Sequence, residues 1–136
     1  METANLREST LMKNLLALLF VALLLNGCDR GDAKVRQQLL GTWQKPDGGQ
    51  ITLQADGSFH SHWTLSLTNT PKEWLYDGTW SIKDNSVRLA ITNAGARNTT
   101  NFEAIGTIEH WKIIQLDEKR LTIANTNQTN SFERGK

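Results

Sequence analysis

The sequence contains a single cysteine, Cys28, and no apolar run long enough to cross a bilayer. One cysteine excludes a disulfide within the chain, and a thiolate metal site normally needs several ligands. The longest apolar run, residues 15–25, has the sequence LLALLFVALLL. A membrane-spanning helix needs ~20 apolar residues, so this run is too short. The chain has 15 Lys and Arg against 14 Asp and Glu, without a basic cluster, which argues against a nucleic-acid partner.

The apolar run and the cysteine together indicate an exported lipoprotein. Lys13 precedes the run and small residues follow it, as in a secretory signal peptide. The sequence Leu25-Asn26-Gly27-Cys28 then resembles the bacterial lipobox. This resemblance implies that a diacylglyceryl group is attached to the Cys28 thiol, that cleavage removes residues 1–27, and that acyl chains hold the protein at a membrane. The alternatives are an ordinary secretory signal and a short buried helix.

Two further features concern export and location. Met12 could be the true start, because Met12-Lys13-Asn14 opens a compact signal, whereas residues 1–11 add two glutamates that do not suit a positive region. By resemblance to enteric lipoproteins, Asp29 favours the periplasmic face of the inner membrane. The outer membrane is the alternative.

Removing residues 1–27 from the 136-residue chain leaves 109 residues, enough for one domain. Residues 28–38 are predicted to be the lipidated cysteine and a polar tether, since DRGDAKVRQQ is short and polar. Residues 39–136 are predicted to form the folded part. This part contains no cysteine and therefore no disulfide bond, so packing and strand pairing must stabilise the domain.

Apolar and polar residues alternate through most of this part, which is typical of half-buried strands. The clearest case is the run that places Phe59 and Trp63 on one face and His60 and His62 on the other. The predicted strands are 40–45, 50–55, 58–67, 74–82, 86–92, 102–116, 120–125 and 129–134. The stretch 102–116 is either one strand or two, with Gly106 as a possible bulge.

The connections between these strands are too short for crossover helices, and Asp56-Gly57 is a strong hairpin signal. The prediction is therefore an all-β, antiparallel up-and-down meander of about eight strands. Closure into a barrel would remove exposed strand edges. A two-sheet sandwich is the alternative, because it produces the same alternation.

The run Leu39-Leu40-Gly41-Thr42-Trp43 resembles the Gly-x-Trp opening of lipocalins and the wider calycin group. Tyr76-Asp77-Gly78-Thr79-Trp80 is also similar to small bacterial lipocalin-like lipoproteins. The resemblance covers most of residues 39–134 and implies that Trp43 closes the base of a barrel under Arg134, with Gly41 as part of the signature. It departs from the family in lacking a Thr-Asp-Tyr segment and in its short length.

Three tryptophans are the candidate ligand-binding residues: Trp63, Trp74 and Trp80. Trp63 and Trp80 fall on predicted inward faces, and Trp74 begins a strand. An eight-stranded barrel is just wide enough for its own side chains or for one small ligand. The expected function is therefore non-catalytic binding of a small apolar or amphipathic molecule or of an envelope protein, and the alternative is a structural module with a filled barrel.

Enzymatic and metal-binding functions are distant alternatives. The sequence has no Gly-x-Ser-x-Gly, His-Glu-x-x-His or glycine-rich phosphate motif, and no cofactor is expected. His60 and His62 share a strand face, with His110 as a possible third ligand of zinc or copper. Their face is opposite to the apolar one, which predicts solvent-exposed histidines and no metal site.

Overall fold

The computed structural model describes residues 30–66 and 69–136, so the predicted signal peptide, Cys28 and Asp29 lie outside the described residues. Residues Lys34–Lys136 form one compact unit. The described residues before Lys34 belong to the first turn of a helix, α2 (Arg30–Leu39). No helix among the described residues is long and apolar enough to span a bilayer.

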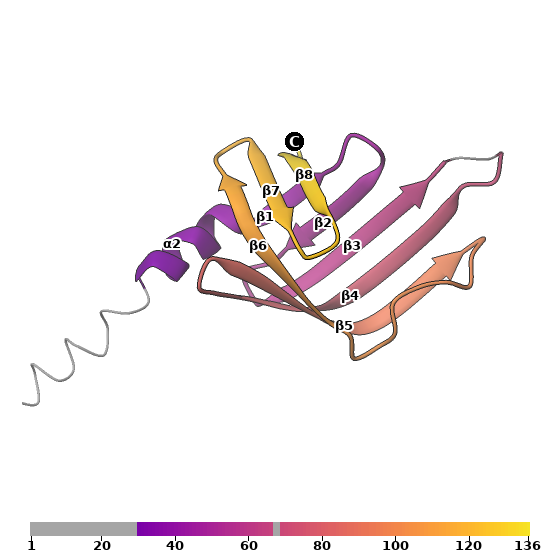
Figure 1. The fold of residues 1–136 in the computed structure, drawn as a ribbon, viewed down its shortest axis with the longest axis horizontal. Coiled ribbons are helices and arrows are strands. Elements are labelled where there is room, and N and C mark those ends of the chain that lie inside the picture. Colours follow the sequence, from indigo (N-terminus) through magenta and orange to yellow (C-terminus); the bar gives the residue numbers. More distant parts are fainter. Residues whose placement is uncertain (1–29, 67–68) are drawn as a thin grey trace, which may run out of the picture. The chain divides into compact units, whose positions relative to one another are not determined.

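Eight antiparallel strands follow the helix and close into a barrel in the order β1 to β8 (Figure 1). The strands are β1 (Gly41–Gln44), β2 (Gly49–Leu53), β3 (Ser58–Leu65), β4 (Lys72–Lys83), β5 (Ser86–Arg97), β6 (Ile108–Leu116), β7 (Arg120–Ala124) and β8 (Thr129–Arg134). The predicted all-β barrel is confirmed, in preference to a sandwich. Each strand pairs with its sequence neighbours, and β1 pairs with β8 to leave no open edge along the ring.

The period-two pattern of the sequence places the core inside the barrel. In β3, Phe59 and Ser61 are buried, whereas His60 and His62 are exposed. The same alternation fills the interior with large apolar side chains, and the core cluster lies entirely between Leu39 and Phe132. The compact unit therefore contains its own core and all of its strand pairing, so a fragment from Asp29 to Lys136 includes the interactions that hold the barrel.

Most strands start and end within about two residues of the predicted bounds, but β5 and β6 differ by more. β5 continues to Arg97, past the predicted end at residue 92, because Asn93–Arg97 pair with β4 although they lack apolar alternation. β6 begins only at Ile108, so residues 102–107 are not a strand. Gly106 adopts a positive φ of 93° in the turn before β6. The irregularity in β6 lies between Ile113 and Gln115, which buries Ile113 and leaves Ile114 58% exposed.

Gly78 is required at the other irregularity, where the register of β4 against β5 shifts between Asp77 and Gly78. A Cβ atom at this position would collide with the backbone carbonyl oxygen of Ala90 and with the Phe59 ring. Because the carbonyl belongs to the paired strand, it cannot move aside as a flexible side chain would. The close approach of β4 and β5 therefore depends on a residue without a side chain.

The predicted polar tether is wrong for residues 30–38, which are helical. In the part of α2 that belongs to the barrel unit, Val35 and Leu39 are spaced four residues apart and pack against the core, with Leu39 fully buried. The Arg36 guanidinium lies 4.3 Å from the centroid of the Trp80 ring and donates a hydrogen bond to the Ala55 carbonyl. The prediction failed because two apolar positions in ten residues do not stand out as an amphipathic pattern.

One end of the barrel is closed by Trp43, whose side chain is 0% exposed. Its indole N–H donates to the Leu39 carbonyl oxygen at 2.8 Å, which ties the helix to the barrel. The Arg134 guanidinium lies 4.2 Å from the centroid of the Trp43 ring. Arg134 also donates to three backbone carbonyl oxygens, those of Gln38, Leu40 and Glu118.

Gly41 has a reason to be glycine at this closed end. Its φ of +114° lies in a region that side chains rarely adopt, and a Cβ atom would lie 3.3 Å from Arg134 Nη1. The structure thus brings Gly41, Trp43 and Arg134 together, as the lipocalin resemblance implies. Strand pairing explains the contact, because Trp43 and Arg134 are directly opposite each other where β1 meets β8.

Candidate functional site: a cavity inside the barrel

The barrel contains a cavity of about 440 Å³ that is partly open to solvent. Small-molecule sites typically measure ~300–1,000 Å³, so this volume can hold a small ligand. The lining comes from seven of the eight strands, from the connections after β1 and β7 and from the connection between β5 and β6. The lining residues are Lys45, Ile51, Phe59, Ser61, Trp63, Trp74, Tyr76, Leu89, Ile91, Glu103, Glu109, Trp111, Ile123, Gln128, Asn130 and Phe132.

Aromatic side chains form much of the wall. Trp63 makes an edge-on contact with Phe132, with ring centroids 5.9 Å apart and planes at 66°. Gly49 in β2 pairs with Trp63, and a Cβ atom there would collide with the indole ring. Gly49 therefore lets the Trp63 ring lie against the barrel wall, which keeps the space beside it open.

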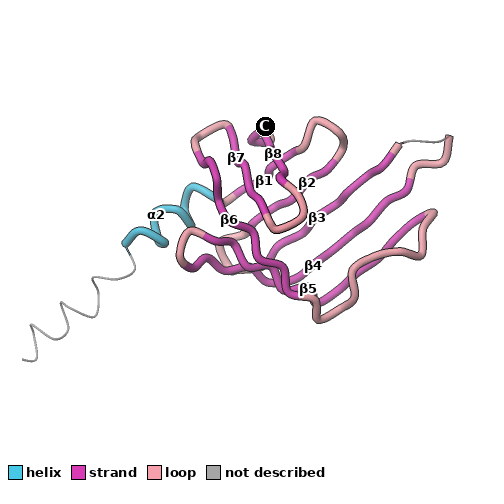
Figure 2. Tube along the Cα trace, viewed as in Figure 1, coloured by secondary structure: helices cyan, strands magenta, loops and turns pink. Residues whose placement is uncertain are grey.

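The connection between β5 and β6 returns along β5 (Figure 2). Its residue Glu103 lines the cavity. Backbone hydrogen bonds attach the end of this connection to β5: the Ile91 N–H donates to the Thr107 carbonyl oxygen, and the Gly106 N–H donates to the Ile91 carbonyl oxygen. Two aromatic side chains of β4 attach its middle: Trp74 Nε1 donates to the Asn101 carbonyl oxygen at 2.6 Å, and the Glu103 backbone N–H donates to the Tyr76 hydroxyl at 3.1 Å. Residues that point into the barrel thus position this connection.

Two buried polar side chains face the cavity. Ser61 in β3 is 7% exposed and Asn130 in β8 is 9% exposed. Neither the Ser61 hydroxyl nor the Asn130 side-chain amide forms a hydrogen bond with another residue in the described part of the chain. No side-chain nitrogen or oxygen atom of the described residues is both fully buried and without a partner, so the polar atoms of Ser61 and Asn130 are accessible from the cavity. A partner inside the cavity, either water or a ligand, would satisfy both groups.

Three charged side chains line the cavity: Lys45, Glu103 and Glu109. Lys45 Nζ lies 3.2 Å from Asp47 Oδ2 and 5.8 Å from the centroid of the Trp63 ring, so its charge already has a partner. Glu109 shares the inward face of β6 with Trp111, and its Oε2 accepts a hydrogen bond from Trp111 Nε1 at 2.7 Å. Neither glutamate forms an ion pair with a described residue.

The electrostatics of Tyr76 show that this wall is negative. Burial is the largest cause that raises the pKa of the Tyr76 hydroxyl, and the hydrogen bond from the Glu103 backbone partly offsets it. The nearby carboxylates of Glu103 and Glu109 raise the pKa of Tyr76 further, because a second negative charge is unfavourable beside them. The hydroxyl therefore stays protonated at neutral pH, and its proton is available to a ligand.

Two of the three predicted ligand-binding tryptophans, Trp63 and Trp74, line the cavity. The third does not. Trp80 is buried near the closed end, where its indole N–H donates to the Gln54 carbonyl oxygen at 2.9 Å and Arg36 covers its ring. The prediction was wrong for Trp80 because alternation indicates which side of the sheet a residue faces but not its height along the barrel.

Sequence reasoning missed other cavity residues, above all Tyr76, Glu109 and Asn130. Tyr76 alternates with Trp74 on one strand, so the signal was present in the period-two pattern. Glu109 was hidden because it lies in the ambiguous stretch whose strand start was misplaced. Asn130 carries no signal, since polar residues in short strands usually face solvent.

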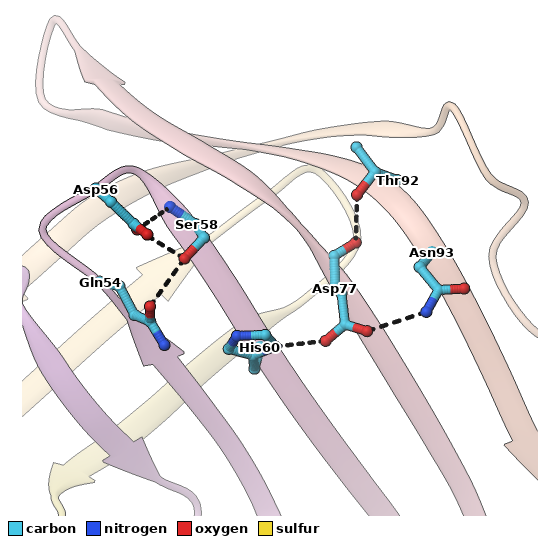
Figure 3. Close-up of polar contacts among 7 residues, drawn as sticks. All are labelled: Gln54, Asp56, Ser58, His60, Asp77, Thr92 and Asn93. Carbon is cyan, nitrogen blue, oxygen red and sulfur yellow. Dashed lines mark hydrogen bonds and ion pairs between the residues drawn. The ribbon is translucent and has the colours of Figure 1, made fainter.

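The histidines lie on the outer surface, as predicted. His60 Nδ1 donates to Asp77 Oδ1 at 2.5 Å, and Asn93 Nδ2 donates to Asp77 Oδ2 at 3.1 Å (Figure 3). These bonds lower the pKa of Asp77, His60 having the largest effect. His62 lies 3.7 Å from Glu73, while His110 is on β6, away from both. Within the described ranges, no three potential metal ligands come together.

Comparison with solved structures identifies the fold. The crystal structure of a lipocalin-like protein from Bacteroides uniformis ATCC 8492 matches with a TM-score of 0.50 and 19% sequence identity, over 71% of this chain and 97% of that one. This barrel is lipocalin-like. No protein-family description matches the sequence, and no curated protein matches it.

Proposed function

We propose that this chain is a lipid-anchored, non-catalytic binding protein of the bacterial envelope that takes a small apolar or amphipathic molecule into its barrel. The lipobox-like sequence ending at Cys28 supports the anchor. The lipocalin-like barrel supports the binding role. In this proposal Asp29 retains the protein at the periplasmic face of the inner membrane, with the outer membrane as the alternative.

The observation that carries the binding role is the cavity of about 440 Å³, which has an aromatic wall and two polar side chains, those of Ser61 and Asn130, that are accessible from it. A barrel filled by its own side chains would leave no such volume. Burying apolar surface against Trp63 and Phe132 would contribute ~25 cal/mol per Å² of ligand surface removed from water. Ser61 and Asn130 would then hydrogen-bond to water that stays beside the ligand.

Titration of the fragment from Asp29 to Lys136 with an apolar dye that fluoresces on leaving water tests this role. We expect saturable binding at one site and quenching of tryptophan emission. Trp63→Ala should weaken dye binding by removing part of the wall, whereas Trp80→Phe, outside the cavity, should leave the affinity unchanged. Dye binding by Trp63→Ala but not by the native fragment would reject the proposal, because it would show a filled barrel opened by the mutation.

Labelling with radioactive palmitate tests the anchor separately. In a bacterial host, we expect the native chain to carry label and to fractionate with membranes. Cys28→Ser should lose both, whereas Gly27→Ala, which keeps a small residue before the cysteine, should retain them. Unchanged labelling of Cys28→Ser would contradict the lipoprotein assignment without affecting the binding role.

A further inference from the structure

The basic side chain that lines the cavity has an ion-pair partner, whereas the two acidic side chains have no basic partner among the described residues. This difference bears on the charge of the ligand. Lys45 is the single basic side chain in the lining, and Asp47 and the Trp63 ring already contact it. The two acidic side chains, Glu103 and Glu109, have no basic partner in the described part of the chain. The lining therefore has a net charge of one negative unit.

Both glutamates are linked to aromatic side chains, Glu109 through its carboxylate and Glu103, an exposed residue, through its backbone. Glu109 accepts the Trp111 indole N–H at 2.7 Å through one oxygen, which leaves the other oxygen free of any described donor. Glu103 is held against β4 by the bond between its backbone N–H and the Tyr76 hydroxyl. Trp74, two residues from Tyr76 on the same face of β4, is tied to Asn101, two residues before Glu103.

Aromatic faces and carboxylates attract the same kind of group. The face of an indole or phenol ring is the negative part of its quadrupole, which draws an ammonium group lying over it. A carboxylate adds a full charge, and its effect is larger in a partly buried cavity than in water. An anionic ligand would instead meet two uncompensated negative charges, so the lining discriminates against it.

On the basis of the proposed binding function, we propose that the cavity selects amphipathic cations, molecules with one ammonium or protonated amine group and an apolar body. The ammonium group lies between the Glu109 and Glu103 carboxylates and the rings of Trp74, Tyr76 and Trp111. The apolar body extends toward Phe59, Phe132 and Ile123, whose side chains are buried deeper in the barrel.

Three probes with the same ten-carbon chain test this selectivity: decyltrimethylammonium, decanol and decanoate. Each is titrated against the dye-loaded fragment from Asp29 to Lys136, below its micelle concentration and at low salt. We expect decyltrimethylammonium to displace the dye about five- to tenfold more strongly than decanoate, with decanol between them. The preference should shrink at high salt, because added ions screen partly exposed charges.

Variants locate the selectivity. Glu109→Gln keeps an oxygen for the Trp111 indole and removes the charge, so it should weaken decyltrimethylammonium by about three- to tenfold while leaving decanol unchanged. Glu103→Gln should act in the same direction. Glu118→Gln, an exposed change of the same kind in the turn after β6, is the matched control and should change nothing. Thermal unfolding of each variant shows that its barrel is intact.

The outcomes separate this inference from the function on which it rests. If none of the three probes binds, the proposed binding function fails. If decanol binds and decanoate binds as tightly as decyltrimethylammonium, the binding function stands and the cationic selectivity is wrong. A preference that persists in the Glu103→Gln, Glu109→Gln double variant would likewise overturn the inference, because the selectivity would then arise elsewhere.

Discussion

The two ends of this barrel use similar residues in opposite ways. At the closed end, Trp43 is fully buried, its indole N–H is bonded to Leu39, and Arg134 covers its ring while three backbone carbonyls hold the guanidinium. At the open end, Lys45 lies over the half-buried Trp63 ring, beside a cavity. At the closed end, the hydrogen-bonded Trp43–Arg134 pair therefore stabilises the fold. At the open end, the Trp63–Lys45 pair borders the candidate binding site.

Trp43→Ala should have the largest effect on stability, because removing a fully buried indole leaves a cavity and breaks the bond to Leu39. We expect a loss of ~3–5 kcal/mol in the free energy of unfolding. Trp63→Ala at the open end should cost clearly less, since its ring already borders empty space. Denaturant titrations of both variants measure the difference. If Trp43→Ala and Trp63→Ala lowered the free energy of unfolding equally, the closed end would be no more tightly packed than the open end.

Arg134→Ala should cost ~2–3 kcal/mol, less than Trp43→Ala, through the loss of charge-assisted hydrogen bonds to three carbonyls and of the stacking on Trp43. A double-mutant cycle of the two positions should give a coupling of ~0.5–2 kcal/mol. Arg120→Ala, an exposed change on β7, supplies the control cycle with Trp43. A Trp43–Arg134 coupling no larger than the control would show that the stacked pair contributes nothing to the closed end.

Gly78→Ala and Gly95→Ala compare the tight part of the sheet with its open part. A Cβ atom at Gly78 collides with the Ala90 carbonyl, whereas at Gly95 nothing lies within 4 Å. We expect Gly78→Ala to lose ~1–3 kcal/mol, as overpacked positions do, and Gly95→Ala to change stability by less than ~1 kcal/mol. Thermal unfolding distinguishes them. A tolerated Gly78→Ala would mean that β4 and β5 can separate without cost.

Asp77→Asn on the outer face should have the smallest effect, at most ~1 kcal/mol, because the His60–Asp77 contact is solvent-exposed. The folded state lowers the pKa of Asp77 below its usual 3.8, so its stabilising contribution is present above that pH and is lost as the pH falls through the folded pKa. The stability difference between the native fragment and Asp77→Asn should therefore shrink as the pH falls through the folded pKa of Asp77. A difference that grows below pH 3.8 would contradict this account.

Strand number could be predicted because the alternation and the Asp56-Gly57 turn act locally, whereas alternation alone did not distinguish a closed barrel from a sandwich. The helix at residues 30–38 could not be predicted from the sequence. Its stability depends on the packing of Val35 and Leu39 onto the barrel, and the local sequence does not reveal that contact. The start of β6 was misplaced for a related reason. Residues 102–107 are apolar enough to resemble a strand, but bonds from Tyr76 and Ile91 hold them in a different path.

The sequence alone determined which side of the sheet each residue faces, since successive side chains in a strand must point to opposite sides. It therefore placed Trp63 and Trp80 on the inner face, and it placed Trp74 only at the start of a strand. Only the tertiary structure decided which of them meet, because height along the barrel depends on the register between paired strands and on the closure of β1 against β8. That register brings Trp63 opposite Trp74 at the cavity and leaves Trp80 beside Arg36 near the closed end. Glu109 reaches the same cavity from β6, a strand that pairs with neither β3 nor β4, so no local pattern could have connected it to Trp63 and Trp74.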